Sequence, residues 1–207
     1  MYIYMNAVIR RCTLLNYTAE DIEIDRKTDA ELYKEFLNGN EEAFNNIIRK
    51  YRKPLISFIS RLVKSVEVAE DIAQDTFVYV LMNETEYDFK YSLKTYLYTI
   101  AKCRAINYLK RERKVVSYDE AYMREKEETY IDEDLIKEEN KKEIYEAIGK
   151  LKKSYQIVIY LKDIEGLKYK EISRILNKTV PQLKMMTHRA RKSLEKTMRK
   201  EVKKNVR

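Results

Sequence analysis

The segment KYKEISRILNKTVPQLKMMTHRARKSLEK, residues 168–196, carries the sharpest structural pattern in the chain. Ile172 and Ile175 are spaced as the apolar face of a short helix. Asn177 begins a short turn, and asparagine tolerates the left-handed backbone conformation that such turns often need. Thr179 is placed to cap a second helix that has a proline in its first turn. The segment predicts a helix-turn-helix, whose second helix lies in the DNA major groove.

The second helix of this motif has two distinct faces. Four side chains fall within about 60° of one another on a helical wheel and are expected in the core: Leu183, Met186, Ala190 and Leu194. Five residues occupy the other side and are expected to contact DNA: Gln182, Lys184, Met185, His188 and Arg189. The two cations suit phosphates, and the other three are placed to touch base edges. The alternative is a solvated basic surface.

Composition and periodicity predict an all-α chain with two domains. The 207 residues include 3 Gly and 2 Pro, which leaves little room for the turns of β architectures. Amphipathic segments over residues 29–114 predict a bundle of about four helices, and residues 141–207 form the second domain. Residues 1–28 receive no role.

Several boundaries inside these domains follow from single residues. Asp29 is expected to cap the first helix, which Asn38-Gly39-Asn40 then ends. Pro54 is expected to interrupt or restart the second helix, and Gly166 to end a helix of the second domain.

Charge is distributed unevenly along the chain. The formal net charge is +8, yet residues 119–139 hold ten acidic and three basic side chains. Residues 166–207 hold fourteen basic and three acidic side chains. We therefore expect residues 115–140 to be a flexible acidic linker, and the basic parts to meet a polyanion.

Two segments of the first domain carry further patterns. In AEDIAQDTFVYVL, residues 69–81, Ile72, Phe77, Val80 and Leu81 are expected to face inward. The outward face is acidic and polar: Glu70, Asp71, Gln74 and Asp75. On its own this face is equally consistent with a solvated helix surface.

The segment LKTYLYTIAKCRAINYLKRERK, residues 93–114, interleaves tyrosines with lysines and arginines. Aromatic rings that stack on bases, beside cations that follow phosphates, are typical of single-stranded nucleic-acid binding. For Tyr98 and Tyr108 we expect packing inside the bundle instead.

The sequence gives no indication of catalysis or of a cofactor. It has no glycine-rich phosphate loop, and the single histidine, His188, has no partner at ligand or base spacing. Cys12 and Cys103 fit neither a disulfide framework nor a zinc site. No apolar run is long enough to span a membrane, and Arg10-Arg11 follow the N-terminal apolar residues, the wrong order for a signal peptide. We expect a soluble cytoplasmic protein.

Together these segments resemble the extracytoplasmic-function sigma factors, the smallest members of the sigma-70 family. The resemblance covers about residues 29–114 and 141–198. It is carried by EAFNNIIRKY (42–51), AEDIAQDTF (69–77), YLYTIAKCRAINYLKR (96–111), and KDIEGLKYKEISRIL (162–176) followed by HRARKSL (188–194).

The resemblance implies a role for each part. Residues 69–77 would contact the clamp helices of the polymerase β′ subunit through Glu70, Asp71, Gln74 and Asp75. The loop 88–93 and the helix after it would open the −10 region and capture an extruded base. The expected −10 contacts are Lys94, Tyr96, Lys102, Cys103, Arg104, Lys110 and Arg111. The second domain would read the −35 element and bind the β flap, the linker would thread the polymerase channels, and an anti-sigma factor is an expected partner.

The chain departs from the family pattern at three places. Tyr96 stands where tryptophan is usual, and Cys103 stands where asparagine is common. Met185 and Met186 replace a usual Ser-Arg pair, and Thr187 replaces an apolar residue. Apolar contact with a thymine methyl is therefore expected here in place of arginine-to-guanine pairing.

Two other classes of protein remain open on the sequence. A helix-turn-helix regulator would bind duplex DNA without polymerase, usually as a dimer, and would need no acidic polymerase-binding face. A helical interaction module would have no obvious use for the basic C-terminal segment.

Overall fold

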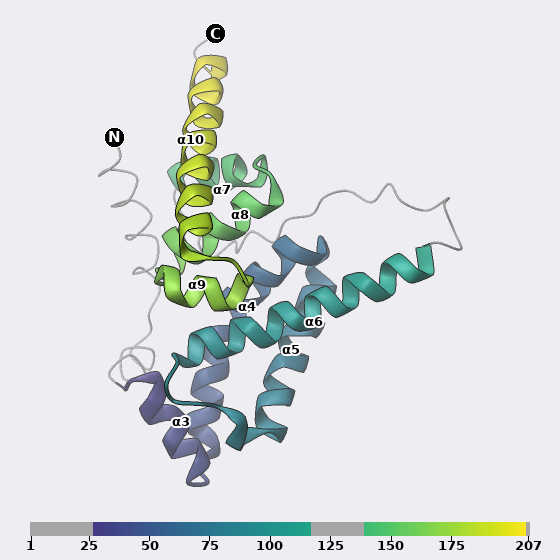
Figure 1. Cartoon of the computed structure of the whole chain (residues 1–207), viewed down its shortest axis with the longest axis vertical. Coiled ribbons are helices and arrows are strands. Elements are labelled where there is room, and N and C mark those ends of the chain that lie inside the picture. Colours follow the sequence, from purple (N-terminus) through teal and green to yellow (C-terminus); the bar gives the residue numbers. More distant parts are fainter. Residues whose placement is uncertain (1–26, 117–138, 206–207) are drawn as a thin grey trace. The chain divides into compact units, whose positions relative to one another are not determined.

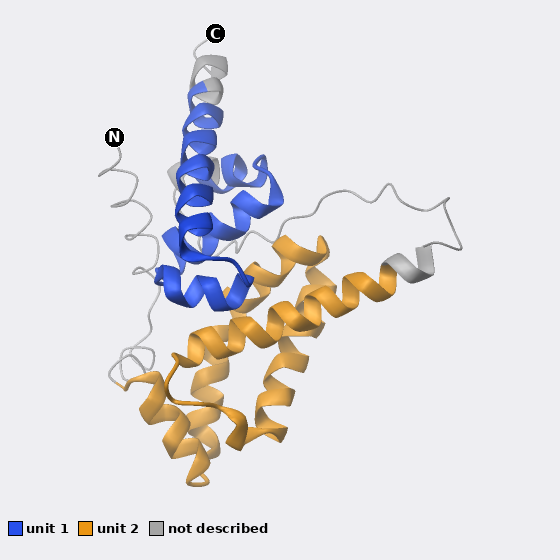
Figure 2. Cartoon of the chain, viewed as in Figure 1, with its two compact units in different colours: residues 1–16, 131–207 blue, residues 17–130 orange. Residues whose placement is uncertain are grey.

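The computed structural model describes residues 27–116 and 139–205. Every regular element within these ranges is a helix, which confirms the all-α prediction (Figure 1). The chain divides into two compact units, with residues 27–116 in one and residues 139–205 in the other (Figure 2). The expectations for residues 1–26 and for most of the acidic linker lie outside the described residues.

The N-terminal unit is a helical bundle built around helix α4. Its elements are α3 (Asp29–Leu37), α4 (Glu41–Val63), α5 (Val66–Met82), the 3-10 turn η1 (Glu84–Glu86) and α6 (Leu93–Val116). Helix α4 packs against α3, α5 and α6, and α5 also packs against α6. The largest fully buried side chains of this unit include Tyr33, Ile47, Phe58, Ile59, Leu97 and Tyr98. Burial of Tyr98 confirms its expected packing role.

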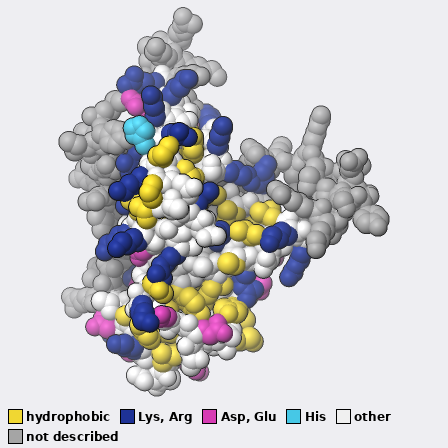
Figure 3. All heavy atoms as spheres, viewed as in Figure 1, with side chains coloured by type: hydrophobic (Ala, Val, Ile, Leu, Met, Phe, Trp, Pro, Cys, Tyr) yellow, Lys and Arg dark blue, Asp and Glu magenta, His cyan; other side chains and the backbone are white. Residues whose placement is uncertain are grey.

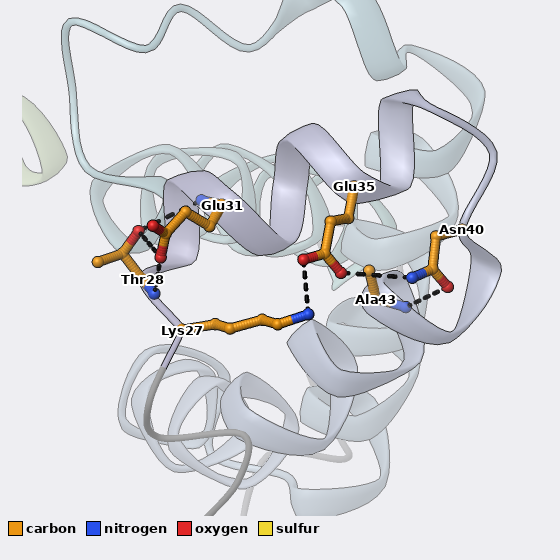
Figure 4. A network of polar contacts seen from close by, with 6 residues as sticks. All are labelled: Lys27, Thr28, Glu31, Glu35, Asn40 and Ala43. Carbon is orange, nitrogen blue, oxygen red and sulfur yellow. Dashed lines mark hydrogen bonds and ion pairs between the residues drawn. The ribbon is translucent and has the colours of Figure 1, made fainter.

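Helix α3 begins one residue earlier than the sequence predicts. Thr28, not Asp29, is the cap: its hydroxyl accepts the Glu31 N–H at 3.3 Å, and the Glu31 carboxylate accepts the Thr28 N–H at 2.7 Å (Figure 4). The hydrogen bonds from Thr28 lower the pKa of Glu31. Asp29 serves the packing instead, because its carboxylate pairs with Lys50 of α4 at 2.8 Å and accepts the Tyr51 hydroxyl.

The turn between α3 and α4 forms where Asn38-Gly39-Asn40 predicts it. Gly39 has a φ of 91°, a conformation that glycine adopts without strain. Asn40 caps α4 by accepting the Ala43 N–H, and its amide donates to Glu35, which also pairs with Lys27 (Figure 4).

The expected interruption of the second helix at Pro54 is wrong. Helix α4 runs without a break from Glu41 to Val63. Apolar residues on the C-terminal side of the proline, among them Leu55, Phe58 and Ile59, are fully buried. Burial of this continuous stripe outweighs the single backbone hydrogen bond that a proline cannot donate.

The C-terminal unit packs three shorter helical segments against one long helix. Its elements are α7 (Glu139–Gly149), α8 (Lys153–Ile159), the π turn η3 (Tyr160–Ile164), α9 (Tyr169–Leu176) and α10 (Val180–Asn205). Helix α10 packs against α7, α8 and α9. The core of the C-terminal unit contains Ala147, Val158, Leu161, Ile172, Ile175, Leu183, Ala190 and Leu194. The helix before α9 ends at Ile164, and Gly166 follows with a φ of 70°, as predicted.

A buried glutamine closes the turn between α7 and α8. The Gln156 side-chain amide donates to the backbone carbonyls of Gly149 at 2.8 Å and Leu151 at 2.9 Å. Both carbonyls lie at or beyond the end of α7, where helix carbonyls lack partners within the helix. Gln156 therefore links the C-terminal end of α7 to α8.

Candidate nucleic-acid interface

Helix α5 presents the acidic face that the sequence predicts. Its exposed residues include all four members of the predicted polymerase contact: Glu70, Asp71, Gln74 and Asp75. On the inner side Ile72, Phe77 and Val80 are buried against α4 and α6. The four polar side chains therefore form one solvent-facing surface on a single helix.

The C-terminal half of α5 carries an exposed apolar stripe. Val78, Leu81 and Met82 all lie on the surface, so the expected inward position of Leu81 is wrong. Helix α5 carries apolar residues on more than one side, and the core covers only one of them. Clustered exposed apolar side chains are typical of protein contact surfaces. In the sequence, the apolar residues of this helix extend beyond a single face, and this pattern indicates an exposed apolar surface.

A polar network joins α5 to α6 beside this surface. The Asp75 carboxylate lies 3.6 Å from an Arg104 guanidinium nitrogen. The same guanidinium lies over the Tyr79 ring at 5.2 Å, and the Tyr79 hydroxyl donates to Glu86 at 2.7 Å. That hydrogen bond raises the pKa of Tyr79. A predicted polymerase contact, Asp75, and a predicted DNA contact, Arg104, are thus electrostatic partners within the chain.

The predicted −10 contacts on α6 differ in their exposure. Cys103, Lys110 and Arg111 are exposed, whereas Lys94, Tyr96, Lys102 and Arg104 are half-buried. The Tyr96 ring packs on Tyr87 with centroids 5.3 Å apart. Its hydroxyl is buried and has no hydrogen-bond partner among the described residues, and burial raises its pKa. Tyr96 therefore presents only part of its ring to a ligand.

An aromatic cluster supports the loop between η1 and α6. Tyr87 lies 4.7 Å from both Tyr33 and Phe89, measured between ring centroids. The Tyr33 hydroxyl donates to the Glu84 carbonyl and the Tyr87 hydroxyl to the Tyr91 carbonyl, so both rings fasten the loop backbone. Burial raises the pKa of Tyr87 to about 12 and raises that of Tyr33 further. Residues this far apart in sequence gave no periodic signal, and the cluster was not predicted.

One exposed ring of this cluster faces a cation. Phe89 is exposed, and the Lys34 ammonium lies 5.7 Å from its ring centroid. An aromatic face beside a cation is the pairing that suits an unstacked base and its phosphate. The loop 88–93, expected to capture a base, thus has an exposed aromatic ring that a base could stack on, with a lysine ammonium beside it.

The turn between α9 and α10 has the conformation that the sequence predicts. Asn177 ends α9 with a φ of 52° in the left-handed region. The Ser173 hydroxyl donates to the Lys178 carbonyl at 2.6 Å and fixes the turn against α9. Thr179 caps α10, since its hydroxyl accepts the Gln182 N–H at 3.4 Å. The helix-turn-helix is therefore formed by local hydrogen bonds.

Helix α10 separates a buried face from an exposed one. Leu183, Ala190 and Leu194 are buried, whereas Met186 is only half-buried. Thr187 is buried as well, and its hydroxyl donates to the Leu183 carbonyl at 2.9 Å, which satisfies a polar group in an apolar position. The five predicted −35 contacts are all exposed: Gln182, Lys184, Met185, His188 and Arg189. In Figure 3 lysine and arginine side chains gather along this helix.

A shielded ion pair joins α10 to η3. Arg191 donates from Nε to Asp163 Oδ2 at 3.0 Å, and its terminal nitrogen donates to Asp163 Oδ1. Two parallel hydrogen bonds of this kind fix the direction of both side chains. The pair thus links η3 and α10 in one geometry, in addition to the buried apolar side chains of α10.

The described residues hold no cluster of three or more histidine, cysteine, aspartate or glutamate side chains suited to a metal ion. Cys103 is a free, exposed thiol, and Cys12 lies outside the described residues. No helix within the described ranges has the length and hydropathy needed to cross a membrane.

Comparison with known proteins identifies both units. Residues 47–115 match the model of sigma-70 region 2, and residues 141–194 match that of sigma-70 region 4. The RNA polymerase sigma factor YlaC of Bacillus subtilis is 30% identical over 168 residues, which are 78% of this chain and 95% of YlaC. The chain belongs to the extracytoplasmic-function sigma factors of the sigma-70 family.

Other relatives agree with this assignment. The extracytoplasmic-function sigma factor SigW of Bacillus subtilis is 30% identical, with 80% of this sigma factor and 94% of SigW covered. The solved structure of the sigma factor RpoE in complex with the anti-sigma factor NepR, from Bartonella quintana, has the same fold with a TM-score of 0.61. That likeness covers 75% of this chain and 96% of RpoE at 18% identity.

Proposed function

We propose that this sigma factor binds core RNA polymerase, recognises −10 and −35 promoter elements and opens the DNA for initiation. The observation that carries the proposal is the presence of both sigma-70 regions in one chain, in the family's order. The region 2 unit offers an exposed acidic helix face, and the region 4 unit offers an exposed basic one. One chain therefore has complementary surfaces for a protein and for DNA.

The polymerase contact is assigned to the acidic face of α5. Glu70, Asp71, Gln74 and Asp75 would meet cations on the clamp helices of the β′ subunit. The apolar stripe of Val78, Leu81 and Met82 would extend the contact, since charged groups give orientation and apolar burial gives affinity.

The −10 contact is assigned to α6 and the loop before it. Exposed Lys110 and Arg111 would follow the phosphates of the opened strand. Half-buried Lys94, Tyr96, Lys102 and Arg104, with exposed Cys103, would border an extruded base. Unstacking that base costs a few kcal/mol, which stacking and phosphate contacts offset.

The −35 contact is assigned to the exposed face of α10. Lys184 and Arg189 would bind phosphates, whereas Met185 and His188 would reach base edges in the major groove. Gln182, at the start of the helix, lies on the same exposed side. The region 4 unit would also contact the β flap, and the acidic linker would occupy polymerase channels that otherwise hold nucleic acid.

The same assignment implies where the protein acts and what holds it inactive. Its partners place it in the cytoplasm, it needs no cofactor, and the catalysis of transcription belongs to the polymerase. An anti-sigma factor would cover the polymerase-binding faces of both units, and the apolar stripe on α5 suits such a protein partner. Co-purification of the full chain with its bound proteins tests this part.

Transcription in vitro with purified core polymerase tests the proposal as a whole. The template is a promoter library with randomised −35 and −10 elements. We expect transcripts that share both elements only when the chain is present. A chain that binds duplex DNA alone and adds no transcripts would be a helix-turn-helix regulator, which would overturn the proposal.

A further inference from the structure

The exposed side of α10 continues well past the helix-turn-helix. The match to sigma-70 region 4 ends at residue 194, whereas α10 continues to Asn205 and extends beyond α7, α8 and α9 (Figure 1). Two lysines in this later part of the helix, Lys192 and Lys196, are exposed. The expected −35 contacts end at Arg189, so neither lysine is among them.

Both lysines share the direction of the predicted base contact. An α-helix turns by about 100° per residue, which places Lys192 and Lys196 within about 20° of the direction of Met185, one on each side. The buried residues Leu183 and Leu194 point to the opposite side. The exposed face of α10 therefore keeps one direction over about three turns, from Met185 to Lys196.

The charges of these two lysines are not balanced by neighbouring carboxylates. Within residues 27–116 and 139–205, neither Lys192 nor Lys196 has an ion-pair partner. Arg199 differs, because its guanidinium pairs with the Glu195 carboxylate at 2.7 Å. Two ammonium groups on one exposed face are thus available to an anionic partner, while the charge of Arg199 is already balanced within the chain.

The dimensions of DNA place phosphates beside these lysines. The major groove is about 12 Å wide and about 8.5 Å deep. Residues 182–189 span about 10 Å along the helix axis, which is close to the groove width. A straight helix whose first turns reach the base edges therefore comes to the edge of the groove after Arg189. Lys192 and Lys196 follow about 5 Å and about 10 Å beyond Arg189, where the sugar-phosphate backbone lies.

We propose that Lys192 and Lys196 bind DNA phosphates at the edge of the major groove of the −35 element. This inference rests on the proposed −35 role of α10 and extends its contact beyond the helix-turn-helix. Phosphate contacts give affinity without sequence information, so the two lysines hold the docked helix while side chains nearer its start select bases. A protein that bound the lysines instead would compete with DNA, because they share the direction of Met185.

Single-charge substitutions test the two contacts. Lys192→Gln and Lys196→Gln each remove one positive charge and keep a polar side chain. Arg52→Gln removes the same charge from an exposed position on α4 and is the matched control. Promoter affinity of holoenzyme with each full-length variant is measured from about 50 to 200 mM salt. A promoter library with a randomised −35 element gives the base preference of each holoenzyme.

Each lysine variant should lower the steepness of log affinity against log salt by about 0.9, the value for one phosphate contact. Its loss of affinity relative to wild type should therefore shrink about three- to fourfold between the lowest and highest salt. The double variant should show twice this change in slope. Base preference, affinity for core polymerase without DNA, and Tm should stay at the wild-type values. Arg52→Gln should keep the wild-type slope.

Several results would overturn the inference. A wild-type slope in both lysine variants would show that neither lysine binds a phosphate. The same change of slope in Arg52→Gln would attribute the effect to net charge alone. An altered base preference at one position would make the lysine a base-reading residue, and weaker core binding without DNA would assign it to polymerase. If wild-type holoenzyme shows no −35 preference, the proposed function itself fails, and this is seen without any variant.

Discussion

The two units each contain an Asp–Arg pair that joins two helical elements, and the two pairs are built differently. In region 2, Asp75 and Arg104 lie 3.6 Å apart with side chains 67% and 33% exposed. In region 4, Asp163 and Arg191 form two hydrogen bonds with side chains 7% and 22% exposed. A solvent-exposed, loosely aligned pair can exchange partners at little cost, whereas a shielded and aligned pair fixes geometry.

The difference matches what each surface is proposed to do. The acidic face of α5 is proposed to bind polymerase through its carboxylates. A weak internal pair, such as Asp75–Arg104, leaves the Asp75 carboxylate able to bind that partner. The exposed face of α10 must hold several side chains in one register along a groove, so a rigid link to the rest of its unit suits it. The Asp75–Arg104 pair of region 2 is therefore exchangeable, and the Asp163–Arg191 pair of region 4 is fixed.

The largest effect is expected from reversing the charge at Asp75, the carboxylate of the exchangeable pair. Asp75→Lys should lower affinity for core polymerase by about 4 kcal/mol or more, roughly a thousandfold, because it places like charges against the clamp helices. The free energy of unfolding should fall by only about 1 kcal/mol, because the lost pair with Arg104 is exposed and loosely aligned. Core affinity is measured by titration and stability by urea unfolding.

Glu41→Lys, an exposed carboxylate on α4, is the matched control and should leave core affinity unchanged. Normal core affinity in Asp75→Lys would mean that the polymerase contact lies elsewhere.

The next largest effect is expected from breaking the fixed pair. Asp163→Ala should destabilise the region 4 unit by about 3 kcal/mol, because it leaves a shielded guanidinium without its carboxylate. Glu195→Ala, which breaks the exposed pair with Arg199, should cost less than about 1 kcal/mol. Urea unfolding followed by circular dichroism measures both. Equal losses would show that shielding does not distinguish the two pairs.

Which structural features could be predicted from the sequence depended on how far apart in the chain the interacting residues lie. The α9–α10 turn and the exposed face of α10 rest on contacts within a few residues, from Asn177, Thr179 and the helical period, and they were predicted. The Asp163–Arg191 pair joins residues 28 apart in the chain, and no periodic pattern marks it. The aromatic cluster around Tyr87 was missed for the same reason.

Other errors arose where tertiary packing overrode a local rule. Pro54 is a helix breaker by propensity, yet burial on both sides carries α4 through it. Leu81 is apolar and in an amphipathic helix, yet the core covers only the opposite side of α5. Gln182 is exposed on α10 as predicted, but the hydrogen bond that its side chain accepts from the Thr179 N–H was not predicted.

Alkaline pH should affect region 2 through its tyrosine cluster. Burial raises the pKa of Tyr87 from 10 to about 12, and that of Tyr33 is raised as well. A raised folded-state pKa gives a stability contribution that is complete below pH 10 and is lost as pH rises through 12. We expect region 2 to lose stability over this range.

Tyr87→Phe should reduce the alkaline loss, at the cost of the hydrogen bond to the Tyr91 carbonyl. Tyrosine ultraviolet absorbance and circular dichroism, followed together from pH 8 to 13, measure it. A Tyr87→Phe chain with the wild-type alkaline profile would contradict the assignment.

The smallest effect is expected from the exchangeable pair itself. A double-mutant cycle between Asp75→Asn and Arg104→Gln should give a coupling energy of about 0.2–1 kcal/mol in unfolding. The same cycle between Asp163→Asn and Arg191→Gln should give a coupling of about 1.5–3 kcal/mol. A region 2 coupling as large as that of region 4 would remove the contrast between the two units.

Direct association with core RNA polymerase tests the central claim most closely. The purified full chain is titrated into core enzyme over a range of salt concentrations, with Asp75→Lys in parallel. We predict saturable one-to-one binding that weakens as salt rises and is lost in Asp75→Lys. A wild-type chain that fails to bind core enzyme at every salt concentration would contradict the account, even if α10 still binds duplex DNA.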